Sequence, residues 1–426
     1  MLKRFNSLLR YQIISQTKTR KIYATHLPDL DLDYYCDPKN SSEIESNIRV
    51  RKGVGNINKV LDKYKQFVIT PPTNDLYKII KKDLFKELSY LPNKTHPSVK
   101  IHTEPQLLHE INEIKHFHGH TPIEFSEITR RLNLVRTDKL GNTCGHQSYY
   151  FLGELAELEE ALIKYTIENL VKNNFQLVSV PDILPSVIIE NCGMPINIDR
   201  TQIFSLDPVH HGPDLCLSGT AEMSLAGLLM NTVLCEKELP IKLAAVSRCY
   251  RAETSQLKEE RGIYRVHQFT KVEMFVVSNN YQSDDMLEYL RTTQEALFKP
   301  LDFNMRVLDM PPHELGAPAY RKYDIEAWMP GRKNYGEISS CSNCTDYQSR
   351  RLNIRYNNNG QIYYAHTLNG TACAIPRMLI TIVENHQNQK GKIDVPKVLQ
   401  PYMNGKKYIA RNSSVPDLKL MKAKNR

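Results

Sequence analysis

Apolar and polar residues alternate along several segments in the second half of the chain, as in half-buried β-strands. The clearest segment runs from Arg265 to Val277. Successive side chains of a strand face opposite ways, so Val266, Val272, Met274 and Val276 would pack on a core while Arg265, His267, Phe269, Lys271 and Glu273 share the other face. That face offers cations, a ring and a carboxylate to a ligand. The alternative is an amphipathic hairpin whose charges are solvated.

The rest of this half mixes helical and strand patterns. Leucines and isoleucines recur at helical spacing between Phe151 and Asn174. Further alternating segments are Gln176 to Val180, Asp214 to Leu217, Lys242 to Tyr250, Asn304 to Leu308 and Tyr323 to Trp328. Because strands and helices do not alternate regularly, we predict an α+β fold, with an antiparallel sheet flanked by helices.

Two helical patterns in the first quarter predict a small hairpin. They cover Asn56 to Phe67 and Asp75 to Tyr90, with a Pro-rich turn between them. Its lysines are Lys59, Lys63, Lys65, Lys78, Lys81, Lys82 and Lys86. They could contact phosphates or form a solvated helix face. We expect an arm at 29–91, a linker at 92–145, the main domain at 146–410 and a basic tail at 411–426.

Composition and charge narrow the possible partners. The 426 residues carry a formal net charge of +9, which permits RNA binding without establishing it. No apolar run is long enough to span a membrane. Cys341 and Cys344 have zinc-ligand spacing, but a second pair is missing, so packing residues are the favoured interpretation.

The first 28 residues have the composition of a mitochondrial presequence. They contain Lys3, Arg4, Arg10, Lys18, Arg20 and Lys21, and the first acid is Asp29. The alternative is a basic arm that binds RNA. We favour import into mitochondria.

Near the C-terminus, Asn369-Gly370-Thr371-Ala372-Cys373-Ala374-Ile375-Pro376-Arg377 leads into a predicted helix. Proline suits a first helical turn, and Arg377 would add charge where a helix N-terminus already favours anions. The sequence has neither GxGxxG nor GxxxxGK[ST], so a nucleotide would be held without the usual phosphate loops.

These motifs, in order, resemble those of a known family. The segment near Pro181, the hairpin from Arg251 to Phe269 and the segment ending at Arg377 are similar to the three signature motifs of class II aminoacyl-tRNA synthetases. Thr220-Ala221-Glu222 resembles the serine-binding signature of the seryl-tRNA synthetase family. The resemblance covers roughly residues 90 to 405 and is strongest to the animal mitochondrial branch.

The resemblance implies roles for matching positions. It implies catalytic roles for Arg251, Glu253 and Arg377, and ATP contacts for Arg251, Ala252, Glu253, Val266, Phe269, Glu337, Ile338, Ser339, Ser340 and Arg377. The implied serine contacts are Thr220, Ala221, Glu222, Arg251, Glu273 and Thr371. Glu337 and Ser340 match the positions that hold Mg²⁺. A carboxylate at Glu273 would bind the substrate ammonium.

The resemblance also implies partners. These are ATP, serine and mitochondrial tRNA(Ser) in the mitochondrial matrix, with a homodimer built across the first motif. Two departures are a short loop at 254–260 and an arm much shorter than the family's coiled coil. Thr371 stands where most relatives have serine. The short arm supports an alternative: an inactive paralogue that binds RNA or a paralogous seryl-tRNA synthetase. A third possibility is an enzyme that activates an amino acid for an acceptor other than tRNA.

Overall fold

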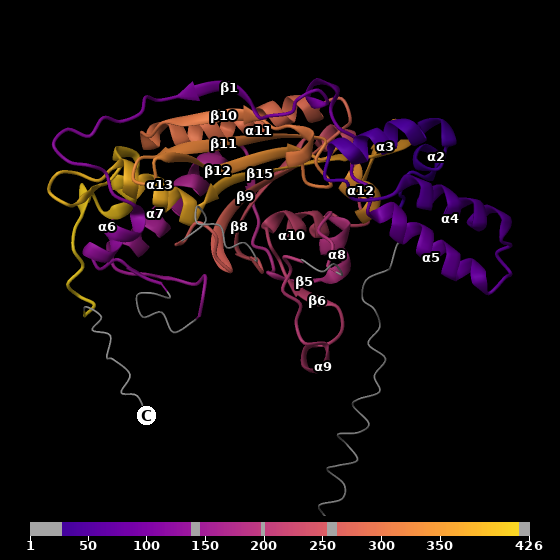
Figure 1. Ribbon diagram of the computed structural model, residues 1–426, viewed down its shortest axis with the longest axis horizontal. Helices are drawn as coiled ribbons and strands as arrows, with labels where there is room; N and C mark the ends of the chain where they lie inside the picture. Colours follow the sequence, from indigo (N-terminus) through magenta and orange to yellow (C-terminus); the bar gives the residue numbers. More distant parts are fainter. Residues whose placement is uncertain (1–27, 138–144, 197–200, 254–261, 417–426) are drawn as a thin grey trace, which may run out of the picture.

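An eight-stranded sheet flanked by helices forms the body of the protein (Figure 1). The computed structural model describes residues 28–137, 145–196, 201–253 and 262–416. The strand order is β1-β10-β11-β12-β15-β9-β8-β4, and every neighbouring pair is antiparallel except β4 with β8. The strands are β1 (Gln106–Ile111), β4 (Gln176–Leu177), β8 (Ile241–Tyr250), β9 (Gln268–Ser278), β10 (Met305–Asp309), β11 (Arg321–Met329), β12 (Asn334–Asn343) and β15 (His366–Ala374). The predicted α+β fold class is confirmed.

Strand β9 is buried on both faces, which explains its continuous apolar stretch. Met274 and Val276 belong to the main hydrophobic core. Phe275 and Val277 point to the opposite face and join a second core. The predicted alternation is therefore confirmed on one face, while the other face is polar only as far as Glu273.

Helices cover both faces of the sheet. The main core includes residues of α7 (Glu154–Lys172), α11 (Ser283–Phe298) and α13 (Ile375–Asn385). Helix α7 confirms the helix predicted from Phe151 to Asn174. The second core lies beneath α8 (Ser186–Asn191) and α10 (Ala221–Leu228). Helix α13 has Pro376 in its first turn, as predicted.

The N-terminal helices form a separate small unit at one end of the molecule (Figure 1). They are α2 (Leu32–Tyr35), α3 (Ser41–Val50), α4 (Ile57–Ile69) and α5 (Leu76–Ser89). Helices α4 and α5 confirm the predicted hairpin. The unit has its own core, which includes Val60 and Leu84. Buried Arg51 connects it to the body by donating hydrogen bonds to the carbonyls of Asn93 and Ala319 at 3.1 and 2.8 Å.

Residues 92–145 differ from the expected linker. They contain β1, α6 (Phe125–Arg131) and β2 (Val135–Arg136), and β1 pairs with β10 as an edge strand of the central sheet. The pairing register shifts between Leu107 and His109, which interrupts the alternation that would reveal the strand. The described residues from 92 to 137 therefore belong structurally to the body.

The remaining elements are short. They are β3 (Tyr150–Phe151), β5 (Ile183–Pro185), α9 (Pro208–His211), β6 (Leu215–Leu217), β7 (Val233–Cys235), α12 (Tyr347–Leu352), β13 (Arg355–Asn358), β14 (Gln361–Tyr364), β16 (Ile393–Asp394) and β17 (Tyr408–Ile409). Among the described residues, no helix combines the length and apolar character needed to cross a membrane. Cys341 and Cys344 are buried. Most of the expected presequence, and the tail beyond residue 416, lie outside the described residues.

Candidate active site

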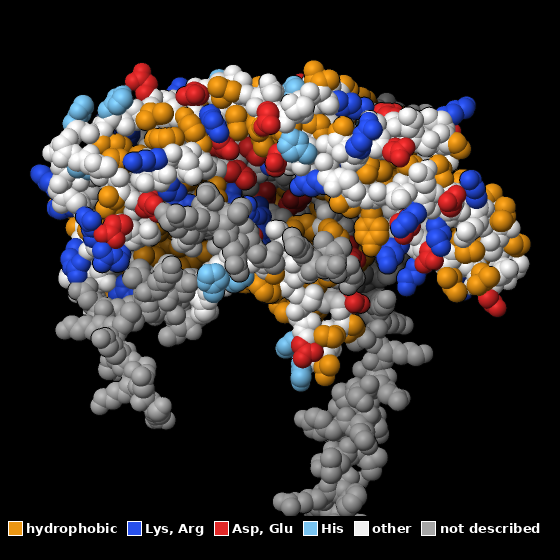
Figure 2. Space-filling view, viewed as in Figure 1, with side chains coloured by type: hydrophobic (Ala, Val, Ile, Leu, Met, Phe, Trp, Pro, Cys, Tyr) orange, Lys and Arg blue, Asp and Glu red, His pale blue; other side chains and the backbone are white. Residues whose placement is uncertain are grey.

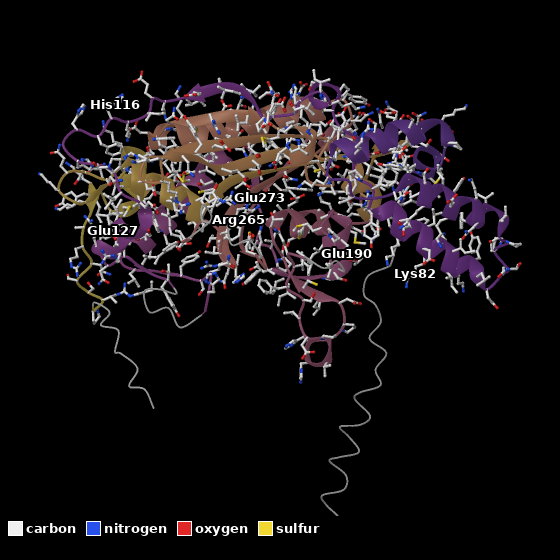
Figure 3. All side chains as sticks on the ribbon, in the orientation of Figure 1. Lys82, His116, Glu127, Glu190, Arg265 and Glu273 are labelled. Atoms are coloured by element: carbon white, nitrogen blue, oxygen red, sulfur yellow. The ribbon has the colours of Figure 1, made fainter. Side chains whose placement is uncertain are left out.

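A cavity of about 270 Å³ lies over the middle of the sheet and gathers nearly all the predicted site residues. Its lining includes Thr220, Glu222, Arg251, Glu253, Val266, Phe269, Glu273, Glu337, Ile338, Ser339, Ser340, Thr371 and Arg377. Figure 3 labels Glu273 and Arg265, which lie close together over the centre of the sheet. Ala221 and Ala252 are not part of the lining. Ala221 is buried in the second core, and the Ala252 amide donates to the carbonyl of Gln202 at 2.9 Å.

Arg251 stands just beyond β8, where backbone pairing still holds it. Its amide donates to the carbonyl of His267 at 3.0 Å. Its guanidinium carbon lies 5.4 Å from the centre of the Phe269 ring. The buried Nε of Arg251 has no hydrogen-bond partner among the described residues. A guanidinium with an unused N–H donor can bind an anion, and the neighbouring aromatic ring can stack on a planar base attached to that anion.

Arg377 enters the cavity from the first turn of α13. Its Nη1 lies 3.3 Å from Oε2 of Glu337 and donates to the Glu337 carbonyl at 3.1 Å. Its guanidinium carbon is 4.7 Å from the centre of the Tyr264 ring. Burial alone would raise the pKa of Glu337, but Arg377, Lys322 and Arg251 outweigh it and hold that pKa at about 2. Glu337 is therefore ionised at neutral pH.

Glu337 and Ser340 form a partial site for a divalent cation. Both line the cavity from β12, and together they offer a carboxylate and a hydroxyl. Among the described residues, no three histidines, cysteines or acids cluster in a metal-binding arrangement. Mg²⁺ commonly takes one or two protein oxygens and completes its shell with water and phosphate oxygens. The two residues fit that kind of site.

Glu222 is fixed at the other end of the cavity. Thr220 caps α10 by accepting a hydrogen bond from the Glu222 amide at 3.3 Å. Gln348 Nε2 and Asn369 Nδ2 both donate to Oε1 of Glu222, at 2.6 and 2.9 Å. Burial, followed by the charge of Glu273, raises the pKa of Glu222 to about 7. These contacts orient the carboxyl group.

Glu273 lies opposite Thr371 in the pairing of β9 with β15. Its Oε2 forms an ion pair with Nζ of Lys271, and the two side chains are only 3% and 7% exposed. That oxygen accepts no aligned hydrogen bond from the described residues. The carboxylate can therefore still accept a hydrogen bond from an ammonium group.

Comparisons with known proteins identify the family. A model of the tRNA synthetase class II core domain (G, H, P, S and T) matches residues 206–386. The mitochondrial serine–tRNA ligase of Saccharomyces cerevisiae is 42% identical over 343 residues, which cover 78% of this chain and 75% of the yeast protein. The chain belongs to the seryl-tRNA synthetase family.

Other members of the seryl-tRNA synthetase family agree in sequence and fold. The mitochondrial serine–tRNA ligase of Bos taurus is 45% identical over 318 residues, 74% of this chain but only 61% of the bovine protein. The seryl-tRNA synthetase of Pyrococcus horikoshii, solved with ATP, is 30% identical with a TM-score of 0.74, covering 90% of this chain and 92% of that one. The cytoplasmic serine–tRNA ligase of Naegleria fowleri, solved with AMP, is 27% identical with a TM-score of 0.77, covering 91% and 100%.

Some predicted residues have structural partners within this family's fold. The Ser339 hydroxyl donates to the Thr371 carbonyl at 2.6 Å and so joins β12 to β15. The Ile338 side chain is buried in the main core. The roles assigned to both residues stay predictions. The loop at 254–260 lies outside the described residues.

Sequence reasoning assigned no role to Gln348, Asn369, Tyr264 or Lys271. Gln348 is 126 positions from Glu222, so local spacing could not reveal their contact. Strand alternation already placed Lys271 on the face of Glu273, without a specific role, and Asn369 lies two residues from Thr371, so the same alternation could have added it. Tyr264 is the residue before Arg265 and gave no distinctive signal.

Proposed function

We propose that the chain activates serine with ATP to form seryl-adenylate and transfers the seryl group to mitochondrial tRNA(Ser). The observation that carries this proposal is that one cavity contains two sets of residues, one suited to a nucleotide and one suited to an amino acid. Arg251, Phe269 and Arg377 suit a nucleotide, whereas Glu222 and Glu273 suit an amino acid. The family membership supports the same activity.

In the proposed first step, the serine carboxylate attacks the α-phosphate of ATP and pyrophosphate leaves. Arg251 would bind the α-phosphate, with Phe269 stacked on the adenine, and Arg377 would bind the γ-phosphate end. Glu273 would hold the ammonium group. Positioning and charge stabilisation drive such a reaction, so no protein nucleophile is needed.

Glu337 and Ser340 are the residues we propose for Mg²⁺. A bound magnesium ion would neutralise part of the triphosphate charge. Glu337 is suited to this because it is ionised near two arginines that would share the same phosphates. In the second step, a terminal ribose hydroxyl of tRNA attacks the adenylate carbonyl and AMP leaves.

The decisive experiment measures serine-dependent exchange between pyrophosphate and ATP, followed by charging of mitochondrial tRNA(Ser). Both activities are expected. Exchange without charging of any tRNA would favour an adenylate-forming enzyme with another acceptor. Loss of both, with RNA or a paralogous synthetase still bound, would favour the inactive paralogue. The short hairpin is the observation behind that alternative.

We also propose a homodimer across the first motif. Strand β4 is the edge of the sheet beyond β8. Val171 and Leu177 beside it are 52% and 49% exposed, which leaves apolar surface for a second copy. Native mass measurement of the purified chain tests this, and a mixed dimer with a paralogue would replace it if the chain is monomeric alone.

Mitochondrial localisation is the last part of the proposal. The basic, acid-free segment before Asp29 supports it. So do the names of the bovine and yeast relatives, which are both mitochondrial. A fluorescent fusion with and without residues 1–28 tests import into the matrix, and unchanged localisation after the deletion would contradict the presequence.

A further inference from the structure

We propose that Lys271 is a built-in counter-cation of the serine pocket, which leaves room for one further cation, the ammonium of the amino acid. The inference rests on the proposed function, since it concerns how that substrate is selected. It makes Lys271 a positioning and specificity residue that acts through Glu222 and Glu273.

The geometry of β9 places Lys271 on the floor of the cavity. Lys271 and Glu273 are two positions apart on one strand face, and both line the cavity. In the pairing with the neighbouring strands, Lys271 lies opposite Ser247 and Ala374, which are small. The lysine side chain is therefore free to reach Glu273, and the two buried side chains form an ion pair. Their burial makes this ion pair a fixed part of the pocket.

The charges of the pocket do not balance without a ligand. Glu222 and Glu273 bring two carboxylates together, and the charge of Glu273 acts on Glu222. Lys271 supplies a single positive charge to both, because it forms the ion pair with Glu273 and its charge also acts on Glu222. Lys271 and Glu273 cancel as an ion pair, so the three groups carry a net charge of −1 whenever Glu222 is ionised. A buried excess charge is costly, so the pocket favours a ligand that adds one cation.

Apart from Arg251, the other charged groups that line the cavity are already matched. Glu337 pairs with Arg377 at 3.3 Å, and Glu253 lies 3.5 Å from Arg265. Arg251 approaches from the end of β8 and faces the nucleotide half of the cavity.

The thiols that face the same carboxylates are neutral. Burial raises the pKa of Cys249, on β8 beside Lys271, and also raises the pKa of Cys192 and Cys344, which lie near Glu222. The charged groups around the proposed ammonium position are therefore Glu222, Glu273 and Lys271.

This arrangement explains why a carboxylate that binds ammonium is itself paired with a lysine. The ion pair with Lys271 holds the Glu273 carboxylate in place before serine arrives. The substrate ammonium can then take up the remaining negative charge near Glu222 and Glu273. Without Lys271, one of the two carboxyl groups would hold a proton at higher pH, and the ammonium would meet a neutral acid.

The test compares the pH dependence of the serine KM, measured by pyrophosphate exchange, in the wild type, Lys271→Met and Lys271→Arg. We expect the acidic limb of kcat/KM for serine to move to higher pH by about one unit or more in Lys271→Met, because an opposite charge at this range lowers a carboxyl pKa by that amount. Lys271→Arg should restore most of the shift. The KM for ATP should change little. Lys242→Met is the matched control, since Lys242 is a lysine of the adjacent strand β8 that donates to the Asn173 carbonyl, outside the cavity.

Each result decides the inference. An unshifted acidic limb in Lys271→Met would overturn it, as would Lys271→Arg behaving like Lys271→Met. If the wild type shows no serine-dependent exchange, the proposed function fails and the inference falls with it, whereas an active wild type isolates the role of Lys271.

A second measurement covers the case in which Lys271→Met does not fold. The double variant Lys271→Met/Glu273→Gln removes both charges of the pair, so its melting temperature should recover relative to the single Lys271→Met variant. No recovery would show that Lys271 contributes packing alone and would overturn the inference.

Discussion

The catalytic cavity and the α4–α5 hairpin both carry many charges, but they hold them in opposite ways. In the cavity, the side chains of Lys271 and Glu273 are 7% and 3% exposed and face each other. On the hairpin, the side chains of Lys65 and Asp62 are 76% and 70% exposed, 3.5 Å apart. Figure 2 shows lysines scattered among acidic and apolar side chains over the hairpin.

In the cavity the identity of each charged residue should matter, whereas on the hairpin only the number of charges should matter. A buried charge has few possible partners, so exchanging or removing one changes its neighbours strongly. Exposed charges are screened by salt and contribute little individually. The cavity should therefore respond sharply to single conservative changes, while the hairpin should respond only to several changes at once.

The largest effect is expected for Glu273→Ala, which tests whether a single change in the cavity abolishes activity. The substitution removes the proposed ammonium partner, and the loss of a charge-assisted contact in a closed site should cost on the order of 2 to 3 kcal/mol or more. Serine-dependent pyrophosphate exchange should fall by about 30-fold or more, by the usual conversion of free energy to rate. Circular dichroism checks that the fold is retained.

The control for that variant is Glu160→Ala, an exposed acid of α7. It removes the same type of charge outside the cavity and should leave exchange near the wild-type rate. Full exchange in Glu273→Ala would show that the ammonium is bound elsewhere.

The next largest effect is expected for Arg251→Lys and Arg377→Lys. Each change keeps the positive charge but removes the planar fork that can bind two phosphate oxygens. We expect roughly tenfold or greater loss in kcat/KM for ATP in each variant, since one strong hydrogen bond to a charged group is worth about 1.5 to 3 kcal/mol. Steady-state exchange at varied ATP measures this. Full activity of both variants would mean that number of charges, not geometry, governs the cavity as well.

Much of the fold followed from local patterns, because buried strands and helices leave periodic traces. The alternation on β8, β9 and β11 and the helical spacing on α7 are of this kind. Strand β1 left no such trace. It is an edge strand with an irregular register, and Leu107 and Leu108 are adjacent and both exposed, at 54% and 43%. Tertiary pairing with β10, which no local pattern encodes, places it in the sheet.

The site followed from ordered motifs, whereas the contacts between its residues did not. The motifs named both Glu222 and Glu273, but they could not show that Gln348 and Asn369 hold Glu222. Alternation placed Lys271 and Glu273 on one face. It could not show that they form an ion pair, because neighbours on a strand face can also point their charges to solvent.

A finer probe of the cavity is the pH dependence of stability. Because the pKa of Glu222 is raised to about 7, its contribution to folding is fully present below the unfolded pKa near 4.3 and is lost as pH rises through about 7. Glu222→Gln keeps an oxygen for Gln348 and Asn369 but removes this dependence. The free energy of unfolding of the variant, minus that of the wild type, should therefore rise by about 1 to 3 kcal/mol between about pH 5 and 7.5.

Urea unfolding at several pH values measures that difference. Glu45→Gln on α3, an exposed acid, controls for the general loss of a carboxylate. A difference between wild type and Glu222→Gln that stays constant over the range would show that Glu222 is not held in a costly charged state.

The smallest effect, and the one that tests the other side of the comparison, concerns the hairpin lysines. On α4, Nζ of Lys63 lies 3.5 Å from Oδ2 of Asp83, and Nζ of Lys65 lies 3.5 Å from Oδ1 of Asp62. These carboxylates offset the charges of the two lysines. The four lysines of α5 form no ion pair with the described residues; they are Lys78, Lys81, Lys82 and Lys86. Figure 3 shows Lys82 on the hairpin, far from Glu273. If this set contacts tRNA, replacing all four with Gln should weaken binding and reduce the salt slope by up to about 0.7 to 0.9 per lost phosphate contact.

Serine activation should survive the fourfold change, because those lysines lie outside the cavity. The matched control replaces Lys390, Lys392, Lys397 and Lys407 and removes the same net charge. These lysines belong to the segment that follows α13, which lies at the end of the molecule away from the hairpin (Figure 1). A third variant ends at Pro416 and lacks Lys419, Lys422, Lys424 and Arg426, which are outside the described residues but could carry RNA contacts. An unchanged salt slope in the hairpin variant would reject the hairpin as a tRNA contact. A loss confined to the truncated chain would assign that role to the tail, and equal losses in the hairpin variant and the matched control would mean that only net charge counts.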